Sequence, residues 1–172
     1  IREKFIRFFE GKGHQEMSAS SLIPDTVDPS VLFTTAGMQQ FKSWFSGEEK
    51  PKYPRVVTIQ PCLRTSDIDE VGNNRHLTFF EMMGNFGFGY DESAPRSSDS
   101  EGGYFKREAI EWAWEFLTDK KWLGIDKKRI YASYFDQGRV KKYKEIKTDK
   151  KSMGILRKIN GLQKIIGEGD DN

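Results

Sequence analysis

Three side chains that bind anions bracket one short loop of this sequence. Arg64 ends an apolar stretch, and Arg75 with His76 opens the next one. A hairpin would therefore bring these three hydrogen-bond donors together where the loop joins the two strands. A guanidinium group binds phosphate through two parallel hydrogen bonds and stays charged at physiological pH. The spacing therefore predicts an anion site that could hold the charge of a reacting triphosphate.

Two phenylalanines lie close to these groups. Residues two apart in a strand share a face, so His76 and Phe80 are expected on one side and Phe79 on the other. An aromatic ring beside arginines can stack a nucleotide base. The same rings can also belong to a core, and the arginines can pair with acids of the loop. The loop holds three such acids: Asp67, Asp69 and Glu70.

A pair of strands must position these groups. Residues 55–64 (RVVTIQPCLR) and 76–88 (HLTFFEMMGNFGF) are rich in β-branched and aromatic side chains, and about eleven mostly polar residues separate them. A loop of this length is usually functional or disordered. We therefore expect two antiparallel strands that present the loop at one end.

The remaining elements follow from periodicity and from breaks in it. Helices are expected over residues 1–11, 39–45 and 105–116, and residues 153–166 carry a weak helix signal. Further strands are expected over residues 14–23, 30–35 and 129–135, with an exposed, mobile insert at 90–103. Strands joined by hairpins, with helices outside, indicate an α+β fold with an antiparallel sheet flanked by helices.

Composition narrows the class of protein. The 172 residues include 13 Phe and 36% hydrophobic residues, which favours one folded domain over disorder. The sequence contains no membrane-spanning run and no signal peptide, so a cytoplasmic location is expected. The lone Cys62 supplies neither a disulfide framework nor a zinc pair, so no metal site is expected. The common phosphate-binding glycine motifs are absent from the sequence, so a nucleotide must be held differently.

Positive charge is concentrated late in the chain. Residues 139–164 contain ten Lys or Arg and only two Asp or Glu. Residues 1–90, by contrast, contain ten Lys or Arg and eleven Asp or Glu. Such a region is either a solvated helix face or a surface that attracts nucleic-acid phosphates.

Several longer strings resemble one enzyme family. Arg64, the acidic loop and RHLTFFEM (75–82) resemble motif 2 of the class II aminoacyl-tRNA synthetases. TTAGMQQF (34–41) and FFEMMGNFGFG (79–89) are similar to the alanine-specific family within that class, and the segment ending at Pro24 looks like its motif 1. The resemblance covers nearly the whole chain, with residues 90–103 as an atypical insert.

The resemblance implies a role for individual residues. Arg64 would be catalytic, gripping the α-phosphate of ATP, and Phe80 would stack on the adenine. Arg75 and His76 would meet the outer phosphates, and Met38 would border the nucleotide, although Met38 could equally be core. Asp67 would lie near the adenosine at the 3′ end of the tRNA.

The resemblance also implies a reaction and its limits. ATP would activate alanine to alanyl-adenylate, with Mg²⁺ held chiefly by the phosphates, and the alanyl group would then pass to tRNA(Ala). Motif 3, the alanine pocket, the zinc-containing editing domain and the oligomerisation region have no counterpart here, so residues 1–172 are expected to be a truncated class II catalytic domain. Zinc is therefore not expected. The alternatives are a non-catalytic paralogue that binds ATP or tRNA, and a plain α+β interaction domain.

Overall fold

A computed structural model of the chain describes residues 1–24, 31–65, 68–74, 76–89, 102–140, 142 and 145–169. They form two compact units, unit 1 (Ile1–Gly103) and unit 2 (Tyr104–Asn172). Unit 1 holds a sheet of strand order β1-β2-β3, and unit 2 holds the pair β4-β5.

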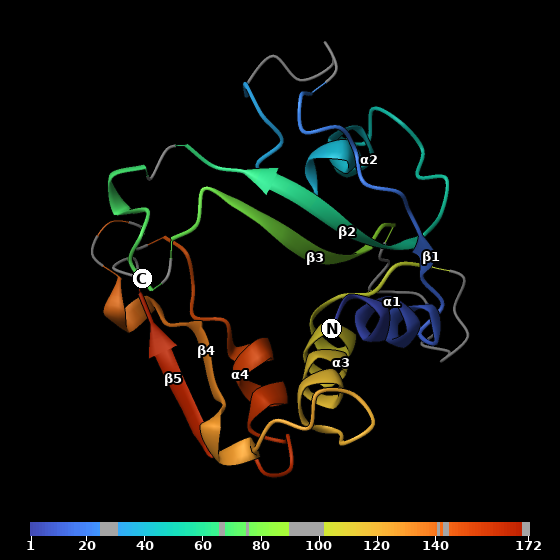
Figure 1. The fold of residues 1–172 in the computed structure, drawn as a ribbon. Helices are drawn as coiled ribbons and strands as arrows, with labels where there is room; N and C mark the ends of the chain where they lie inside the picture. Colours follow the sequence, from blue (N-terminus) through green and yellow to red (C-terminus); the bar gives the residue numbers. More distant parts are fainter. Residues whose placement is uncertain are drawn as a thin grey trace. The chain divides into compact units, whose positions relative to one another are not determined.

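The sheet of unit 1 is built on two long strands. β2 (Arg55–Leu63) and β3 (Phe79–Gly87) pair antiparallel over nine residues each, so the hairpin expected from their composition is confirmed. The short β1 (Gln15–Glu16) adds to the other edge of β2 in parallel. α1 (Arg2–Glu10) lies along one face of the pair, and α2 (Lys42–Ser46) lies on the other (Figure 1). A 3₁₀ turn, η1 (Gln39–Phe41), leads into α2, and η2 (Ile68–Glu70) lies in the loop between the strands.

The face of the sheet toward α2 carries an aromatic core. Phe41 and Val56 are almost fully buried, and the Phe41 ring lies 5.2 Å from the ring of Phe86. Phe88 and Trp44 close this cluster, with ring centroids 5.3 Å apart. Because this cluster anchors one end of the strand pair, the other end is held in a fixed register near Arg64.

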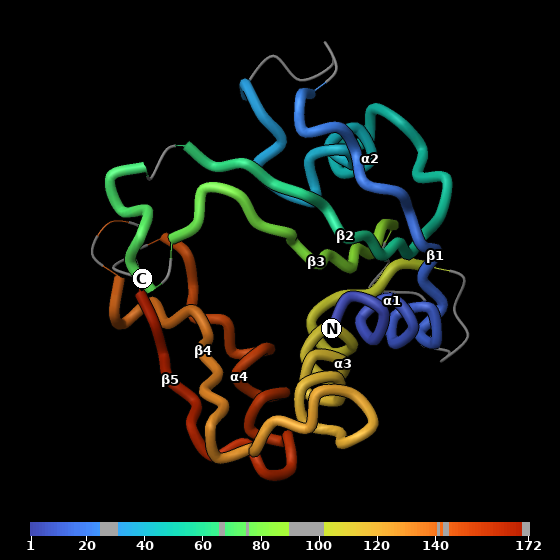
Figure 2. The backbone as a smooth tube through the Cα atoms, viewed as in Figure 1, coloured from blue at the N-terminus to red at the C-terminus, as the bar shows by residue number. Residues whose placement is uncertain are grey.

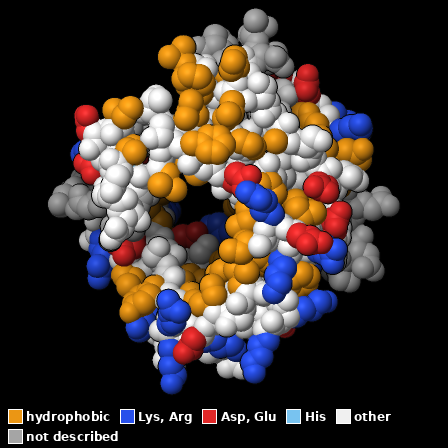
Figure 3. Space-filling model, in the orientation of Figure 1, with side chains coloured by type: hydrophobic (Ala, Val, Ile, Leu, Met, Phe, Trp, Pro, Cys, Tyr) orange, Lys and Arg blue, Asp and Glu red, His pale blue; other side chains and the backbone are white. Residues whose placement is uncertain are grey.

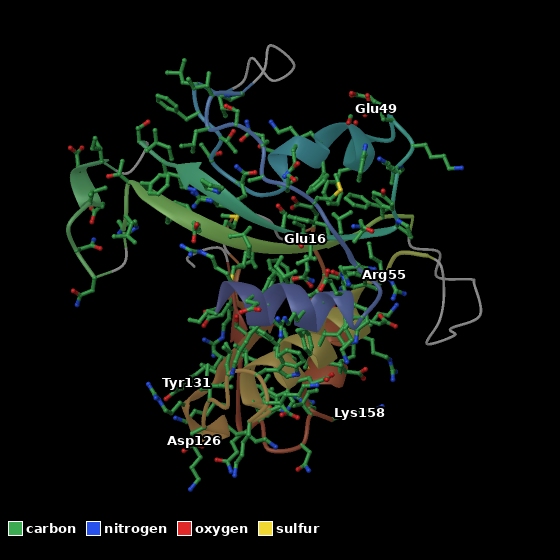
Figure 4. The ribbon with its side chains drawn as sticks, turned by 45° about the vertical axis from the view of Figure 1, so that its right-hand side comes forward. Glu16, Glu49, Arg55, Asp126, Tyr131 and Lys158 are labelled. Carbon is green, nitrogen blue, oxygen red and sulfur yellow. The ribbon has the colours of Figure 1, made fainter. Side chains whose placement is uncertain are left out.

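On the opposite face, α1 packs through a stripe of three buried side chains: Phe5, Phe8 and Phe9. These positions recur at helical spacing, as the sequence predicted. Arg55 is buried at the start of β2, where it donates hydrogen bonds to the carbonyls of Lys12 and Gly102 (Figure 4). At the far end of the sheet, Arg2 forms an ion pair with Glu81.

The described residues of unit 2 form two α-helices, two 3₁₀ turns and two strands. α3 (Lys106–Thr118) is followed by η3 (Lys127–Arg129) and β4 (Tyr131–Phe135), and η4 (Gln137–Arg139) precedes α4 (Lys150–Leu156). β5 (Lys164–Glu168) pairs with β4 in parallel, and α4 contacts β4 (Figure 2). Asp149 caps α4 by accepting a hydrogen bond from the backbone of Ser152.

The expected α+β class is confirmed, with corrections to individual elements. Residues 31–35 form no strand; instead Thr34 bridges two segments, because its N–H donates to Leu22 and its carbonyl accepts from Leu63. The strand expected over 14–23 is reduced to β1, and the weak helix signal over 153–166 divides into the end of α4 and the start of β5. The pairs β1–β2 and β4–β5 are parallel, in addition to the expected antiparallel pair. Nearly all of the 90–103 insert lies outside the described residues.

Candidate functional site

Arg64 lies directly after β2, at the mouth of the hairpin. Its backbone N–H donates to the carbonyl of Thr78 at 2.9 Å, which extends the ladder by one residue. Its side-chain Nε donates to the carbonyl of Thr35 at 3.1 Å, and the side chain is otherwise exposed. One edge of the guanidinium is therefore fixed by the protein, and no described residue binds its two terminal nitrogens, which suit an anion.

Phe80 holds the flat side of the same guanidinium. The central carbon of Arg64 lies 5.2 Å from the centre of the Phe80 ring, within the range of a cation–π contact. Phe80 pairs with Cys62 in the register, so all three side chains belong to one face of the sheet. Cys62 is fully buried beneath them, and burial raises the pKa of its thiol despite the nearby Arg64 charge. Arg64 and Phe80 thus form one preorganised platform.

Gln60 forms the floor of the site, one step further along this face. Its side chain is completely buried, and its Oε1 accepts from the N–H and the hydroxyl of Ser20 at 2.8 and 3.0 Å. Its Nε2 donates to the carbonyls of Ser20 and Pro61. Gln40 adds a longer contact of 3.4 Å. Sequence reasoning did not assign Gln60 a role, although a glutamine inside an apolar strand, at even spacing from Arg64, was the available signal.

Met38 stands in a tight turn beside this floor. The N–H of the preceding Gly37 lies 3.3 Å from the sulfur of Met82, and Gln60 is the residue paired with Met82. A side chain on Gly37 would meet Gln60 and Phe86 at 3.6 and 3.7 Å, so the turn sits directly on the sheet. Met38 itself is 42% exposed, which argues against the alternative that it is core.

His76 is held within its own loop. Its backbone N–H donates to the Asn73 side-chain oxygen at 3.0 Å, and its Nδ1 lies 3.1 Å from the same atom. Asn73 in turn donates to the carboxylate of Glu70. Within the described residues, the polar contacts of His76 therefore stay in the loop and do not join it to Arg64. Arg75 and Asp67 lie outside the described residues.

The structure argues against two alternatives for these residues: an ion pair between Arg64 and the described loop acids, and a core role for the phenylalanines. Among the described residues, Arg64 forms no ion pair with Asp69 or Glu70. Phe79 is 55% exposed and Phe80 is half-buried, so neither ring belongs to the described core. An exposed guanidinium on an aromatic ring is free to bind a ligand.

Two findings concern other classes of site. In the part of the chain that the structure describes, no group of three His, Cys, Asp or Glu side chains is placed to hold a metal ion. Over the same residues, no helix combines the length and the apolar character that a membrane span requires.

Comparison with known proteins shows the family. The family model for class II (A) tRNA synthetases matches residues 1–163. The chain is 50% identical over 137 residues to the alanine–tRNA ligase of Petrotoga mobilis, and 51% identical over 138 residues to that of Thermotoga maritima. It is 52% identical over 136 residues to the alanine–tRNA ligase of Rhodopirellula baltica.

The matched regions cover 79%, 80% and 78% of this chain, and 14%, 14% and 13% of those three relatives. The chain thus spans about one seventh of the length of the relatives it matches. A family match over 163 residues, together with half-identity over most of the chain, is far beyond a shared motif. The chain belongs to the class II (A) tRNA synthetase family.

Proposed function

We propose that this chain is the ATP-binding part of an alanine–tRNA ligase catalytic domain. The observation that carries the proposal is the Arg64 guanidinium, held at Nε by Thr35 and on its flat side by Phe80, with both terminal nitrogens unbound by any described residue. Such a fork suits the α-phosphate of ATP, because it can donate two hydrogen bonds in a fixed direction. The name that the three relatives share, alanine–tRNA ligase, supports alanine and tRNA(Ala) as the other substrates.

The proposed reaction has two steps. The alanine carboxylate attacks the α-phosphorus of ATP in line and displaces pyrophosphate, which leaves alanyl-adenylate. A ribose hydroxyl at the 3′ end of tRNA(Ala) then attacks the alanyl carbonyl, and AMP leaves. Neither step needs a covalent intermediate on the protein, so positioning and charge stabilisation by Arg64 carry this chain's share of the catalysis.

The other assigned residues have supporting roles in this proposal. Phe80 would stack on the adenine, and Met38 would border the nucleotide from its turn on the sheet. Arg75 and His76 would contact the outer phosphates, and Asp67 would contact the 3′ adenosine of the tRNA. Mg²⁺ would arrive with the triphosphate, whose oxygens are ligands it prefers.

Two assays on this chain test the proposal. Titration calorimetry should detect weak ATP binding, and GTP should bind less well if the adenine is recognised. Alanine-dependent exchange of pyrophosphate into ATP should be small or absent, because the resemblance places the alanine pocket outside these residues. Absence of ATP binding would contradict the proposal, and robust exchange would show that the alanine pocket lies within this chain.

The alternative is a paralogue that binds ATP or tRNA without catalysis. Such a paralogue would also bind ATP. It would differ from a ligase in pyrophosphate exchange, measured on a protein that includes the alanine pocket. Exchange by a longer protein that contains this chain would exclude it, whereas ATP binding with no exchange by that longer protein would favour it.

A further inference from the structure

A basic groove runs between the two helices of unit 2. It has a volume of about 300 Å³ and is lined by side chains of α3 and α4 and of the turn that follows α4. We define the basic groove by its lining residues: Arg107, Glu111, Lys150, Lys151, Gly154, Ile155, Lys158 and Ile159. Four of these are cations and one is an acid. Three of the four cations belong to the basic region 139–164 of the sequence, and Arg107 adds the fourth from α3.

Two of the four cations in the groove have no ion-pair partner among the described residues. Glu111 lies 4.0 Å from Arg107 on the same helix, an exposed pair that contributes little. Lys150 and Lys158 are exposed and lie in no ion pair with any described residue. Lys158, labelled in Figure 4, follows the end of α4. A polyanion would therefore meet the ammonium groups of Lys150 and Lys158 without competition from an ion-pair partner among the described residues.

A second, wider hollow adjoins the first and extends the positive surface. It has a volume of about 750 Å³ and shares Lys150 and Lys151 with the groove. Lys147 adds a further exposed cation there and Glu145 an exposed acid, whereas Lys106 is already paired with Asp149 at 2.6 Å. In Figure 3, Lys and Arg side chains gather over the lower part of the view, where Figure 1 draws β4 and β5.

The surface of α4 that lines the groove leaves room for the backbone of a ligand to approach. Gly154 stands in the middle of α4, and a Cβ atom added there would meet nothing within 4 Å. α4 is held in place from its other side by buried Leu156 and at its start by Asp149. The cations on its outer side are thus carried on a fixed support.

We propose that the basic groove binds the sugar-phosphate backbone of double-helical RNA. The inference rests on the proposed function, which makes RNA a substrate of the protein. Lysine ammonium groups act as point charges for phosphates and do not read base edges. The described residues of the groove include no aromatic ring on which an unpaired base could stack, which favours a helical backbone over a single strand.

A charge-reversal experiment tests this binding. The probe is a fluorescently labelled RNA hairpin with about one turn of helix, titrated by anisotropy at several salt concentrations. We compare the wild-type chain with Lys150→Glu/Lys158→Glu, and with Lys50→Glu/Lys120→Glu as a control that makes the same charge change at two exposed sites outside the groove. Loss of two phosphate contacts should weaken binding on the order of tenfold or more and reduce the salt slope by about 2.

A charge-neutral variant locates the contact. Gly154→Trp fills the open side of the groove and should weaken RNA binding several-fold without changing the net charge. Equal losses in the groove pair and the control pair would overturn the proposal, since they would reflect net charge alone. Unchanged RNA binding in the groove pair or in Gly154→Trp, or binding to anionic lipid vesicles but not to RNA, would also overturn it.

ATP titration of the same variants separates this inference from the proposed function. The groove residues do not include the Arg64 platform, so ATP binding should be unchanged in all three variants. If the RNA-binding results contradict the prediction while the chain still binds ATP, only the proposal for the groove is rejected. Absence of ATP binding by the wild-type chain would reject the proposed function itself.

Discussion

At the scale of single residues, the key side chain of the site already has part of its hydrogen-bonding and packing partners within the protein. Arg64 gives one donor to Thr35 and one face to Phe80, so little side-chain entropy remains to be lost when an anion binds. The arginine and the phenylalanine could be selected from the sequence by type and spacing. The Thr35 carbonyl could not, because a backbone acceptor has no signature in the sequence.

Gln60 is the residue on which the floor of the site depends. Replacing it with Leu keeps a similar volume but leaves the part-buried N–H and carbonyl of Ser20 without these partners. We expect a loss of about 1–3 kcal/mol in the free energy of unfolding, together with weaker ATP binding, since Gln40, two residues after Met38, donates to this side chain. Urea unfolding and ATP titration measure the two effects.

The matched control is Gln163→Leu, at an exposed position in unit 2. It should change the unfolding free energy by less than about 0.5 kcal/mol. Full stability and full ATP binding in Gln60→Leu would show that the floor is not held by these hydrogen bonds.

At the scale of elements, strong periodicity was predictive and weak periodicity was not. α1, α3 and the β2–β3 pair follow from apolar stripes and from β-branched runs, and the structure has them within a few residues of the expected bounds. Residues 31–35 look like a strand in composition but form no strand, because their hydrogen bonds go to a neighbouring loop and to the end of β2. Such long-range pairing is invisible to local pattern.

The start of α4 depends on one acidic side chain. Asp149 accepts from the backbone of Ser152 at 3.0 Å and pairs with Lys106 at 2.6 Å. Burial raises its pKa, but the hydrogen bonds from Lys106 and Ser152 outweigh that effect and lower the pKa to about 2. Asp149 is therefore ionised at neutral pH, both as a helix cap and as an ion-pair partner.

Two substitutions separate these contributions. Asp149→Asn keeps a capping oxygen but loses the charge, and Asp149→Ala loses both. We expect Asp149→Ala to destabilise unit 2 by about 1–2 kcal/mol, and Asp149→Asn by clearly less, in thermal or urea unfolding. Equal losses in the two variants would mean that the ion pair, and not the cap, holds the helix.

At the scale of the whole molecule, the chain forms two compact units, and each unit carries a different candidate binding site. Unit 1 carries the Arg64 platform, and unit 2 carries the basic groove. The division was not predicted, because composition and length favoured one domain, although the Ser-, Gly- and acid-rich stretch 90–103 ends at the boundary between the units. The family match extends across both units, through residue 163.

Acid should destabilise the molecule through His14. This residue is buried, its Nδ1–H donates to the carbonyl of Phe9 at 3.0 Å, and burial lowers its pKa from 6.5 to about 4. The unfolded chain therefore takes up a proton at higher pH than the folded chain. The stability is complete above pH 6.5 and falls as the pH drops toward 4.

Urea unfolding at a series of pH values measures this effect. We expect His14 to account for a loss on the order of 2 kcal/mol near pH 4.5. A His14→Gln variant, although less stable at pH 7, should lose less stability over the same interval. An identical pH profile in the variant would exclude His14 as the source.

ATP binding by Arg64 variants tests the central assignment most directly. The dissociation constant for ATP is measured by titration calorimetry for the wild-type chain, Arg64→Ala, Arg64→Lys and the exposed control Arg129→Ala. Loss of two charge-assisted hydrogen bonds should weaken binding about tenfold to a hundredfold in Arg64→Ala. Arg64→Lys should fall between it and the wild type, and Arg129→Ala should match the wild type. Equal ATP binding by Arg64→Ala and the wild-type chain would contradict the assignment of the platform as the nucleotide site.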